Sequence, residues 1–240
     1  MKIIEKIIAK SKDLKGAPAV TLAFLGDSVT QGCFEIYNKL SGDIETVFDQ
    51  DNGYHSHLRR MLAYLYPNVP INVINAGISG GKAAQGLMRL ERDVIVHAPD
   101  LCVVCFGLND STKGMDMLDT YKDSLDKIFK KLKDADIETI FMTPNMMAPT
   151  LSHTVTDALQ KETANKCAGV ENDGVLEAFL SEAKKVAQKN GVRVCDCYAK
   201  WKLLYKNGVD VTELLANKIN HPTREMNKLF AVSLLETMMS

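Results

Sequence analysis

The sequence predicts an α/β fold in which helices pack on both faces of a parallel sheet. Two observations support this prediction: apolar runs of strand length, and helical patterns that alternate with them along the chain. The apolar runs lie at residues 20–25, 71–75, 101–106, 139–143 and 192–196. Strands that are apolar throughout are typical of a parallel sheet, which is buried between two layers of helices.

The helical patterns repeat apolar residues every three or four positions, which is the spacing of an amphipathic helix. They cover residues 54–66, 82–97, 119–134, 174–189 and 223–238. The clearest pattern, 119–134, begins with acidic residues and ends with lysines, an order that favours the helix dipole.

Length and composition predict one domain over residues 1–240. The chain has 240 residues, of which 46% are hydrophobic and 25% charged, as in an ordinary globular protein. Isoleucines recur at helical spacing in residues 1–16, which we expect to form an amphipathic helix that docks on the domain. These isoleucines are Ile3, Ile4, Ile7 and Ile8.

The charge balance argues against polyanionic partners. The formal net charge is −1 at pH 7, so we expect neither a nucleic acid nor an anionic membrane as partner. No apolar run approaches the roughly 20 residues that span a bilayer, and the N-terminal residues do not resemble a signal peptide. We therefore expect a cytoplasmic protein without stable membrane insertion. The sequence contains no indication of an oligomeric state.

The cysteines predict free thiols rather than a metal site. There are six of them, and in a reducing compartment the default is an unpaired thiol. Cys102 and Cys105 have the spacing of a metal clip but lie in an apolar run, where an odd offset points them to opposite faces. His55 and His57, two residues apart, would not share a helix face. We expect no metal and no organic cofactor.

Two connections, 29–53 and 144–173, are too long to be simple turns, and long loops in compact domains are usually functional. Both follow the carboxyl end of a strand, the edge at which open α/β sheets bind ligands. Their large side chains either line a substrate site, with aromatics against a sugar and methionines against an acyl group, or tether the loops to the core. These side chains are Phe34, Tyr37, Phe48, Tyr54, Met146, Met147 and His153.

Ser28 follows the first predicted strand in the sequence Gly26-Asp27-Ser28. A serine at the tip of a buried strand is well placed to be a nucleophile, although the same tripeptide also suits an ordinary turn. The second strand leads into a glycine-rich segment, 75–82, that lacks the pattern of a phosphate loop or of a dinucleotide fingerprint. It fits either a turn whose N–H groups bind an oxyanion or a plain strand-to-helix connection.

Two further polar residues follow later strands. Asn109 ends the third strand, where its amide could donate to the same anion or cap a turn. His221 precedes Pro222, a residue that favours the start of a helix, and lies on the connection after the fifth strand. His221 is therefore either a base that reaches Ser28 or a structural histidine.

These motifs follow one another in the order Ser, Gly, Asn, His, and that order resembles the SGNH (GDSL-type) hydrolase family. The similarity covers nearly the whole chain, and the G-x-S-x-G elbow of the α/β-hydrolases is absent. The matching blocks are Gly26-Asp27-Ser28, Asn75-Ala76-Gly77-Ile78-Ser79-Gly80, Gly107-Leu108-Asn109-Asp110 and His221-Pro222.

The resemblance implies a flavodoxin-like three-layer α/β/α fold with a five-stranded parallel sheet. It also implies that Ser28 is the nucleophile and His221 its base, and that an acyl-enzyme forms. The implied oxyanion hole consists of the Ser28 and Gly80 N–H groups and the Asn109 side-chain amide.

One position departs from the family pattern. The acid that orients the histidine normally stands three residues before it, and here that residue is Lys218, which cannot accept the imidazole N–H. Either a backbone carbonyl around Asn217 and Lys218 orients His221, giving a Ser–His dyad, or Asp196 or Asp210 does so. We rank the carbonyl above both acids.

The resulting functional prediction is a serine ester hydrolase that removes a short acyl group, such as acetyl, from a carbohydrate or other small ester. One alternative is a lysophospholipase or thioesterase, which would need a long apolar channel between the two long connections. An alternative of another class is a catalytically weak sugar- or acyl-binding module, suggested by Lys218. The presence of all of Ser28, Gly80, Asn109 and His221 argues against that module.

Overall fold

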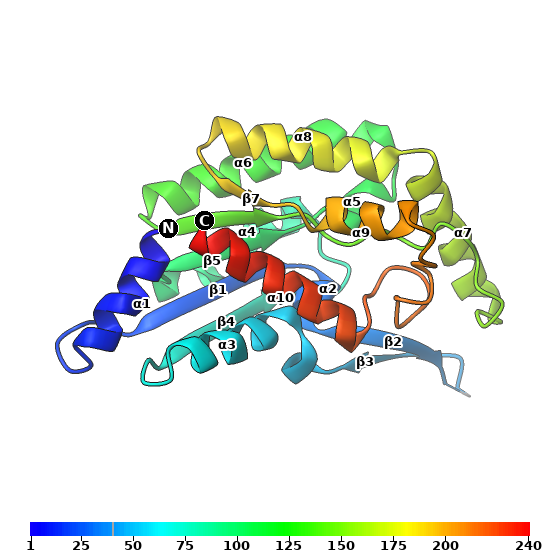
Figure 1. Ribbon diagram of the computed structural model, residues 1–240. Helices are drawn as coiled ribbons and strands as arrows, with labels where there is room; N and C mark the ends of the chain where they lie inside the picture. The colour runs from blue at the N-terminus through cyan, green and yellow to red at the C-terminus, as the bar shows by residue number, and fades with distance from the viewer. Residues whose placement is uncertain (40) are drawn as a thin grey trace.

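The computed structural model describes residues 1–39 and 41–240; Leu40, within the predicted 29–53 connection, lies outside the described residues. Its centre is a five-stranded sheet in the order β4-β1-β5-β6-β7, with all pairs parallel (Figure 1). The strands are β1 (Val20–Gly26), β4 (Ile71–Gly77), β5 (Leu101–Cys105), β6 (Glu138–Met142) and β7 (Arg193–Cys195). The predicted five-stranded parallel sheet is confirmed, and each strand boundary falls within two residues of its prediction.

Helices cover both faces of this sheet, which confirms the three-layer α/β/α architecture (Figure 1). One layer consists of α4 (Ala83–Asp93), α6 (Leu118–Asp134) and α8 (Val175–Lys189). The other consists of α1 (Lys2–Lys12), α3 (Tyr54–Leu65) and α10 (Arg224–Met239). The pattern at 82–97 is interrupted, because α4 ends at Asp93 and a 3-10 turn, Ile95–His97, follows it.

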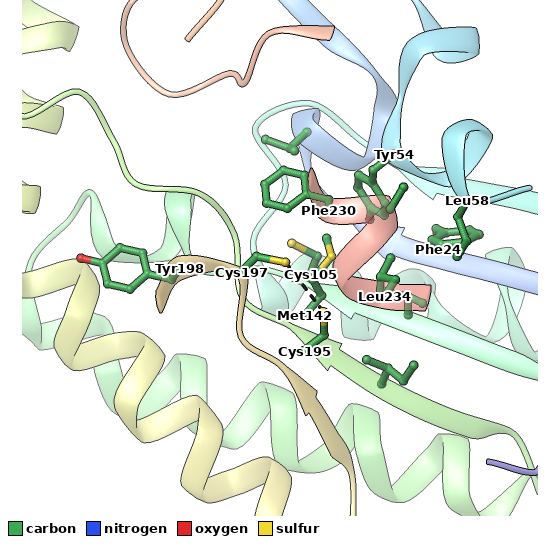
Figure 2. Packing of buried hydrophobic residues seen from close by; sticks show 14 of the residues in the cluster. Phe24, Tyr54, Leu58, Cys105, Met142, Cys195, Cys197, Tyr198, Phe230 and Leu234 are labelled. Carbon is green, nitrogen blue, oxygen red and sulfur yellow. Dashed lines mark hydrogen bonds between the residues drawn. The ribbon is translucent and has the colours of Figure 1, made fainter. Parts of the chain in front are cut away.

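The core is divided by the sheet into two clusters. Successive residues of β5 alternate between them, so Cys102 packs with α4 and α6 whereas Cys105 packs with α3 and α10. Figure 2 shows the cluster on the side of α3 and α10, in which Phe230 and Leu234 of α10 lie near Cys105. The opposite orientations expected for Cys102 and Cys105 are therefore confirmed.

The helix α1 docks on the core through part of its isoleucine stripe. Ile3 and Ile7 are fully buried, whereas Ile8 is 38% exposed. The Glu138 carboxylate, at the start of β6, accepts the N–H groups of Lys2 and Ile3 and so caps the helix. The buried stripe is consequently narrower than the four isoleucines suggested.

The two long connections contain secondary structure that the sequence reading did not assign. Residues 29–53 hold α2 (Ser28–Gln31), the antiparallel hairpin of β2 (Cys33–Asn38) and β3 (Ile44–Phe48), and a 3-10 turn, Gln50–Asn52. Residues 144–173 hold α7 (Ala158–Asn172). Three more elements, α9 (Cys197–Lys206), the short α5 (Leu108–Ser111) and the 3-10 turn Met115–Met117, were also unassigned.

The description of 29–53 and 144–173 as loops was therefore wrong, and the reason is the type of pattern. The hairpin strands mix polar and apolar residues, which is typical of a partly exposed antiparallel pair and unlike the buried runs of the main sheet. The helix α7 has mostly exposed residues and only a weak apolar stripe.

Strand register brings the site residues to one edge. Gly26 at the end of β1 pairs with Gly77 of β4 on one side and with Cys105 of β5 on the other. Segments that follow these three ends therefore begin side by side. A Cβ atom at Gly77 would lie 2.2 Å from the backbone nitrogen of Gln31, so only glycine lets α2 pack this close to β4.

Candidate active site

Ser28 is the first residue of α2, which begins directly after β1. The Asp27 carboxylate caps this short helix by accepting the Val29 N–H at 3.0 Å. Gly32, with φ of 92°, ends it in the left-handed conformation. Both ends of α2 are thus capped, which fixes the Ser28 hydroxyl at the edge of the sheet.

His221 lies on a tight turn just before α10. The Asn217 side-chain oxygen organises this turn by accepting three backbone N–H groups, those of Ile219, Asn220 and His221, at 2.9–3.0 Å. Lys218 adopts a φ of 57° within the turn. The imidazole is 4% exposed, so the turn carries the ring into the protein.

The structure brings Ser28 and His221 together. The distance from Ser28 Oγ to His221 Nε2 is 3.0 Å, and His221 Nδ1 lies 3.0 Å from the backbone oxygen of Phe34. A carbonyl oxygen can only accept, so the Nδ1 proton is donated to Phe34. In the neutral ring, Nε2 is then the free acceptor and faces the Ser28 hydroxyl, as a general base must.

Burial favours the neutral form of this histidine. Loss of solvation lowers the pKa of His221 to about 4, and the hydrogen bond to the Phe34 carbonyl opposes this shift only in part. At neutral pH the ring is consequently uncharged, and Nε2 is available as a proton acceptor.

The group that orients His221 is a backbone carbonyl, but not one near Asn217 or Lys218 as predicted. It is the carbonyl of Phe34 on β2, which sequence reasoning placed in a loop. The Lys218 ammonium binds the Glu213 carboxylate at 2.7 Å and leaves the imidazole alone. The sequence could not identify Phe34 in this role, because residues differ only in their side chains and every one of them has the same backbone carbonyl.

Neither acid considered as a partner for His221 contacts the ring. Asp196 caps α9 through the Ala199 N–H and binds the Lys184 ammonium at 2.8 Å. The Asp210 carboxylate accepts the Thr212 N–H at 3.0 Å. The geometry is thus that of a Ser–His pair oriented by a carbonyl.

The predicted oxyanion donors lie around Ser28. Among the described residues, neither the Ser28 N–H nor the Gly80 N–H has an acceptor in the protein. Gly80 has a φ of 73°, and a Cβ there would point into open space. The Asn109 amide nitrogen lies 3.1 Å from the Gly81 carbonyl and 3.4 Å from an Asp27 oxygen, which ties it to the residues next to Gly80 and Ser28.

Gln31 supports the glycine turn and was missed in the sequence. Its side-chain oxygen accepts the Ser79 N–H at 2.7 Å, and its backbone oxygen accepts from the Asn75 amide at 3.3 Å. Asn75 also accepts the Gly77 N–H and contacts the ring of His55. These bonds connect α2, which carries Ser28, to the turn that carries Gly80.

Two carboxyl groups are buried behind the site. Loss of solvation raises the pKa of Asp27 to about 7 and that of Asp110 to about 6, and the Asp110 charge contributes to the shift of Asp27. Arg89 donates to the carbonyls of Gly26 and Ala76, where β1 and β4 end. No group of three or more metal-ligating side chains is arranged to hold an ion in the part of the chain that the structure describes.

The large side chains of the long connections divide into two groups. Phe34, Tyr54, Met146 and Met147 are buried in the core. Tyr37 and Phe48 are about half exposed on the hairpin, and His153 is exposed as well. The tethering interpretation thus holds for the first group.

An open cavity of about 520 Å³ lies beside the His221 turn, between β2, the start of α7 and residues 216–218. Much of its lining is polar, and Tyr37 contributes an aromatic ring. Besides Tyr37, the polar side chains are those of Glu35, Asn38, Thr154, Thr156, Asp157, Gln160, Asn217 and Lys218.

Residues 24–229 match the model of the GDSL-like lipase/acylhydrolase family. The chain belongs to this family. The match includes Ser28, Gly80, Asn109 and His221, and it confirms the resemblance inferred from their order.

Curated relatives of this GDSL-like chain are esterases. An acetylxylan esterase of Geobacillus stearothermophilus is 30% identical over 132 residues, 51% of this chain and 58% of that protein. An arylesterase of Vibrio mimicus is 28% identical over 96 residues, 38% of this chain and 48% of that protein. The matched segments thus span about half the length of these relatives.

Solved structures share the GDSL-type fold. The acetylxylan esterase of Geobacillus stearothermophilus gives a TM-score of 0.67 at 21% identity, covering 91% of this chain and 94% of that one. A two-domain esterase active on acetylated mannans gives 0.68 at 16% identity, covering 99% of this chain and 52% of that one. At these identities the likeness shows the fold alone.

Proposed function

We propose that the chain is a one-domain ester hydrolase of the GDSL type that removes a short acyl group, acetyl above all, from a carbohydrate or another small ester. The observation that carries this proposal is the contact of Ser28 Oγ with His221 Nε2, in a ring whose other nitrogen is occupied by the Phe34 carbonyl. Family membership supports the same reaction class.

In the proposed reaction, Ser28 Oγ attacks the ester carbonyl while its proton passes to His221 Nε2. The tetrahedral oxyanion is bound by the Ser28 and Gly80 N–H groups and by the Asn109 amide. Collapse expels the alcohol, which takes the proton from His221, and leaves an acyl group on Ser28. Water attacks this acyl-enzyme with His221 again as base, and the carboxylic acid leaves as Ser28 regains its proton.

A sugar as the alcohol half is supported by the polar cavity beside the His221 turn and by the exposed Tyr37 ring, since aromatic and polar side chains together suit a sugar. The acetylxylan esterase relative points in the same direction. The lysophospholipase and thioesterase alternatives are not favoured, because Met146 and Met147, the side chains expected to bind a long acyl chain, are buried in the core.

We also propose a cytoplasmic location and no nucleic-acid partner. The location is supported by the six cysteines, all buried and all free thiols, which suit a reducing compartment. None of the helices in the described ranges 1–39 and 41–240 is both long and apolar enough to cross a membrane.

The test is hydrolysis of p-nitrophenyl esters from acetate to palmitate, and of acetylated xylo-oligosaccharides, by the wild type and by Ser28→Ala. Ser181→Ala, on the exposed side of α8, is the matched control. We expect turnover limited to short chains, abolished in Ser28→Ala and unchanged in the control. A preference for long chains would contradict the substrate class. Absence of both turnover and fluorophosphonate labelling at Ser28 would contradict the enzyme itself.

A further inference from the structure

The Phe34 carbonyl that orients His221 belongs to a part of the fold that is not built into the main sheet. Within the part of the chain that the structure describes, β2 pairs with β3 alone, in a separate two-stranded sheet. Strand register therefore does not place this carbonyl relative to His221, as it places Ser28 relative to Gly77. Other contacts must hold the hairpin in position against the segment that carries the histidine.

Arg224 makes several of these contacts, close to the Phe34 carbonyl. It is the first residue of α10 and lies three positions after His221. Its guanidinium donates to both carboxylate oxygens of Glu35, at 2.6 and 3.2 Å, and its Nε donates to Asp49 at 2.7 Å. The same group lies over the Phe34 ring, 4.3 Å from the ring centroid.

These partners are distributed so that both arms of the hairpin are held. Glu35 directly follows Phe34 on β2, and Asp49 directly follows the end of β3. The Asp49 N–H also donates to the Gly32 carbonyl at 2.8 Å, which joins the cluster to the end of α2. One side chain thus connects the hairpin on both sides of the Phe34 carbonyl to the segment that carries His221.

We infer that Arg224 is a positioning residue for His221: its ion pairs with Glu35 and Asp49 hold the Phe34 carbonyl on His221 Nδ1, so that Arg224 supplies the orientation that the absent acid at position 218 would otherwise give. This inference rests on the proposed function for its effect on rate. It assigns Arg224 no contact with substrate or with the reacting atoms.

The chemistry of the pair suits this role. A planar guanidinium can bind Glu35 with two parallel hydrogen bonds and Asp49 with a third, whereas an ammonium is a point charge without that fork. Hydrogen bonds to Arg224 lower the pKa values of Glu35 and Asp49, so the cluster stays ionised where His221 is neutral. The hydrogen bonds that the structure describes for the imidazole go to Ser28 and the Phe34 carbonyl, so the cluster acts on the ring through geometry.

The kinetic test compares Arg224→Met and Arg224→Lys with Arg92→Met, a control whose exposed guanidinium pairs with Asp93 on α4. For p-nitrophenyl acetate we expect Arg224→Met to lower kcat by about 10- to 100-fold, the scale of a misplacement near 1 Å, with KM within about twofold. Arg224→Lys should recover part of this loss. Millimolar guanidinium should restore activity to Arg224→Ala, whereas Arg92→Met should match the wild type.

A second readout does not depend on esterase activity. Nitrogen-15 NMR of the His221 ring should show a proton held on Nδ1 in the wild type and a mixture of tautomers in Arg224→Met. A folded Arg224→Met protein with kcat within about threefold of the wild type, or with an unchanged ring tautomer, would overturn the inference. A wild type that hydrolyses no ester would instead overturn the proposed function, while the NMR comparison would still decide the role of Arg224.

Discussion

The two halves of the candidate site are held in different ways. Ser28, Gly80 and Asn109 follow three neighbouring strands of the main sheet, so the backbone register of β4, β1 and β5 places them. His221 and the Phe34 carbonyl belong to a turn and to a separate hairpin, which are joined by side-chain contacts. Backbone hydrogen bonds of the sheet therefore hold the nucleophile in place, whereas a few side-chain contacts hold the base.

This difference predicts two classes of substitution: those that remove a reacting group and those that disturb the alignment of groups that are still present. Substitutions at the sheet edge should remove a reacting or charge-stabilising group and leave the architecture intact. Substitutions around His221 should leave every reacting group present and change only how well they are aligned.

Ser28→Ala should abolish ester hydrolysis, with kcat for p-nitrophenyl acetate reduced by about 10⁴-fold or more, because no other group can form the acyl-enzyme. His221→Ala should have a similar effect. The double variant should be little worse than either single one, since the two residues act as a unit. Additive losses in the double variant would show that Ser28 and His221 work independently.

Asn109→Ala should lower kcat by about 10²- to 10³-fold, the loss typical of one oxyanion donor. The Asn109 amide lies next to the Gly81 carbonyl, so a change in the glycine turn must be separated from the loss of the donor. Asn109→Leu serves for this, because it keeps the approximate size and removes the donor without adding a charge beside Asp27, and a thermal melt reports any change in the turn. Activity near wild type in Asn109→Leu would exclude Asn109 from the oxyanion hole.

The pH dependence should report the burial of His221. The base works when neutral, and its pKa is lowered to about 4, so the titration of His221 by itself leaves kcat/KM level from pH 8 to about 5, and a step near pH 7 would report the buried Asp27 instead. Below about pH 4, kcat/KM should fall roughly tenfold per pH unit. In the unfolded chain the histidine binds this proton at its ordinary pKa of about 6.5. In the folded protein it does so only near pH 4, so the free energy of unfolding falls as the pH drops from about 6.5 toward 4.

Circular dichroism at each pH distinguishes this titration from acid unfolding. An acidic limb centred near the ordinary histidine pKa of about 6.5, in protein that remains folded, would show that the imidazole is solvated in the working enzyme.

Lys218→Ala and Asp210→Ala should each keep kcat within about threefold of the wild type, because neither side chain contacts the His221 ring. Asp196→Ala should behave similarly in rate but cost about 1 kcal/mol of stability, since it removes the cap of α9. Thermal melts and kcat on the same preparations make the measurement. A thousandfold loss of kcat from Asp196→Ala or Asp210→Ala would identify a missing acid.

The sequence predicted one half of the site better than the other, and for a physical reason. Uniformly apolar strands specify a buried parallel sheet, and parallel strands bring their carboxyl ends to one edge. The closeness of Ser28, Gly80 and Asn109 to one another follows from those two facts and from the order of the motifs. The hairpin, in contrast, has half-exposed strands, and its signal in the sequence is limited to the strand-favouring residues in 33–37 and the glycine at 42.

Periodicity in the sequence predicts the fold class, and the order of the motifs that contain Ser28, Gly80, Asn109 and His221 predicts the family, because both are properties of the linear chain. What orients His221 depends on folding. The acceptor is the main-chain carbonyl of Phe34, 187 positions away, and Arg224 reaches Glu35 across 189. A carbonyl has the same chemistry at every residue, so its role arises only where folding places it against an imidazole nitrogen.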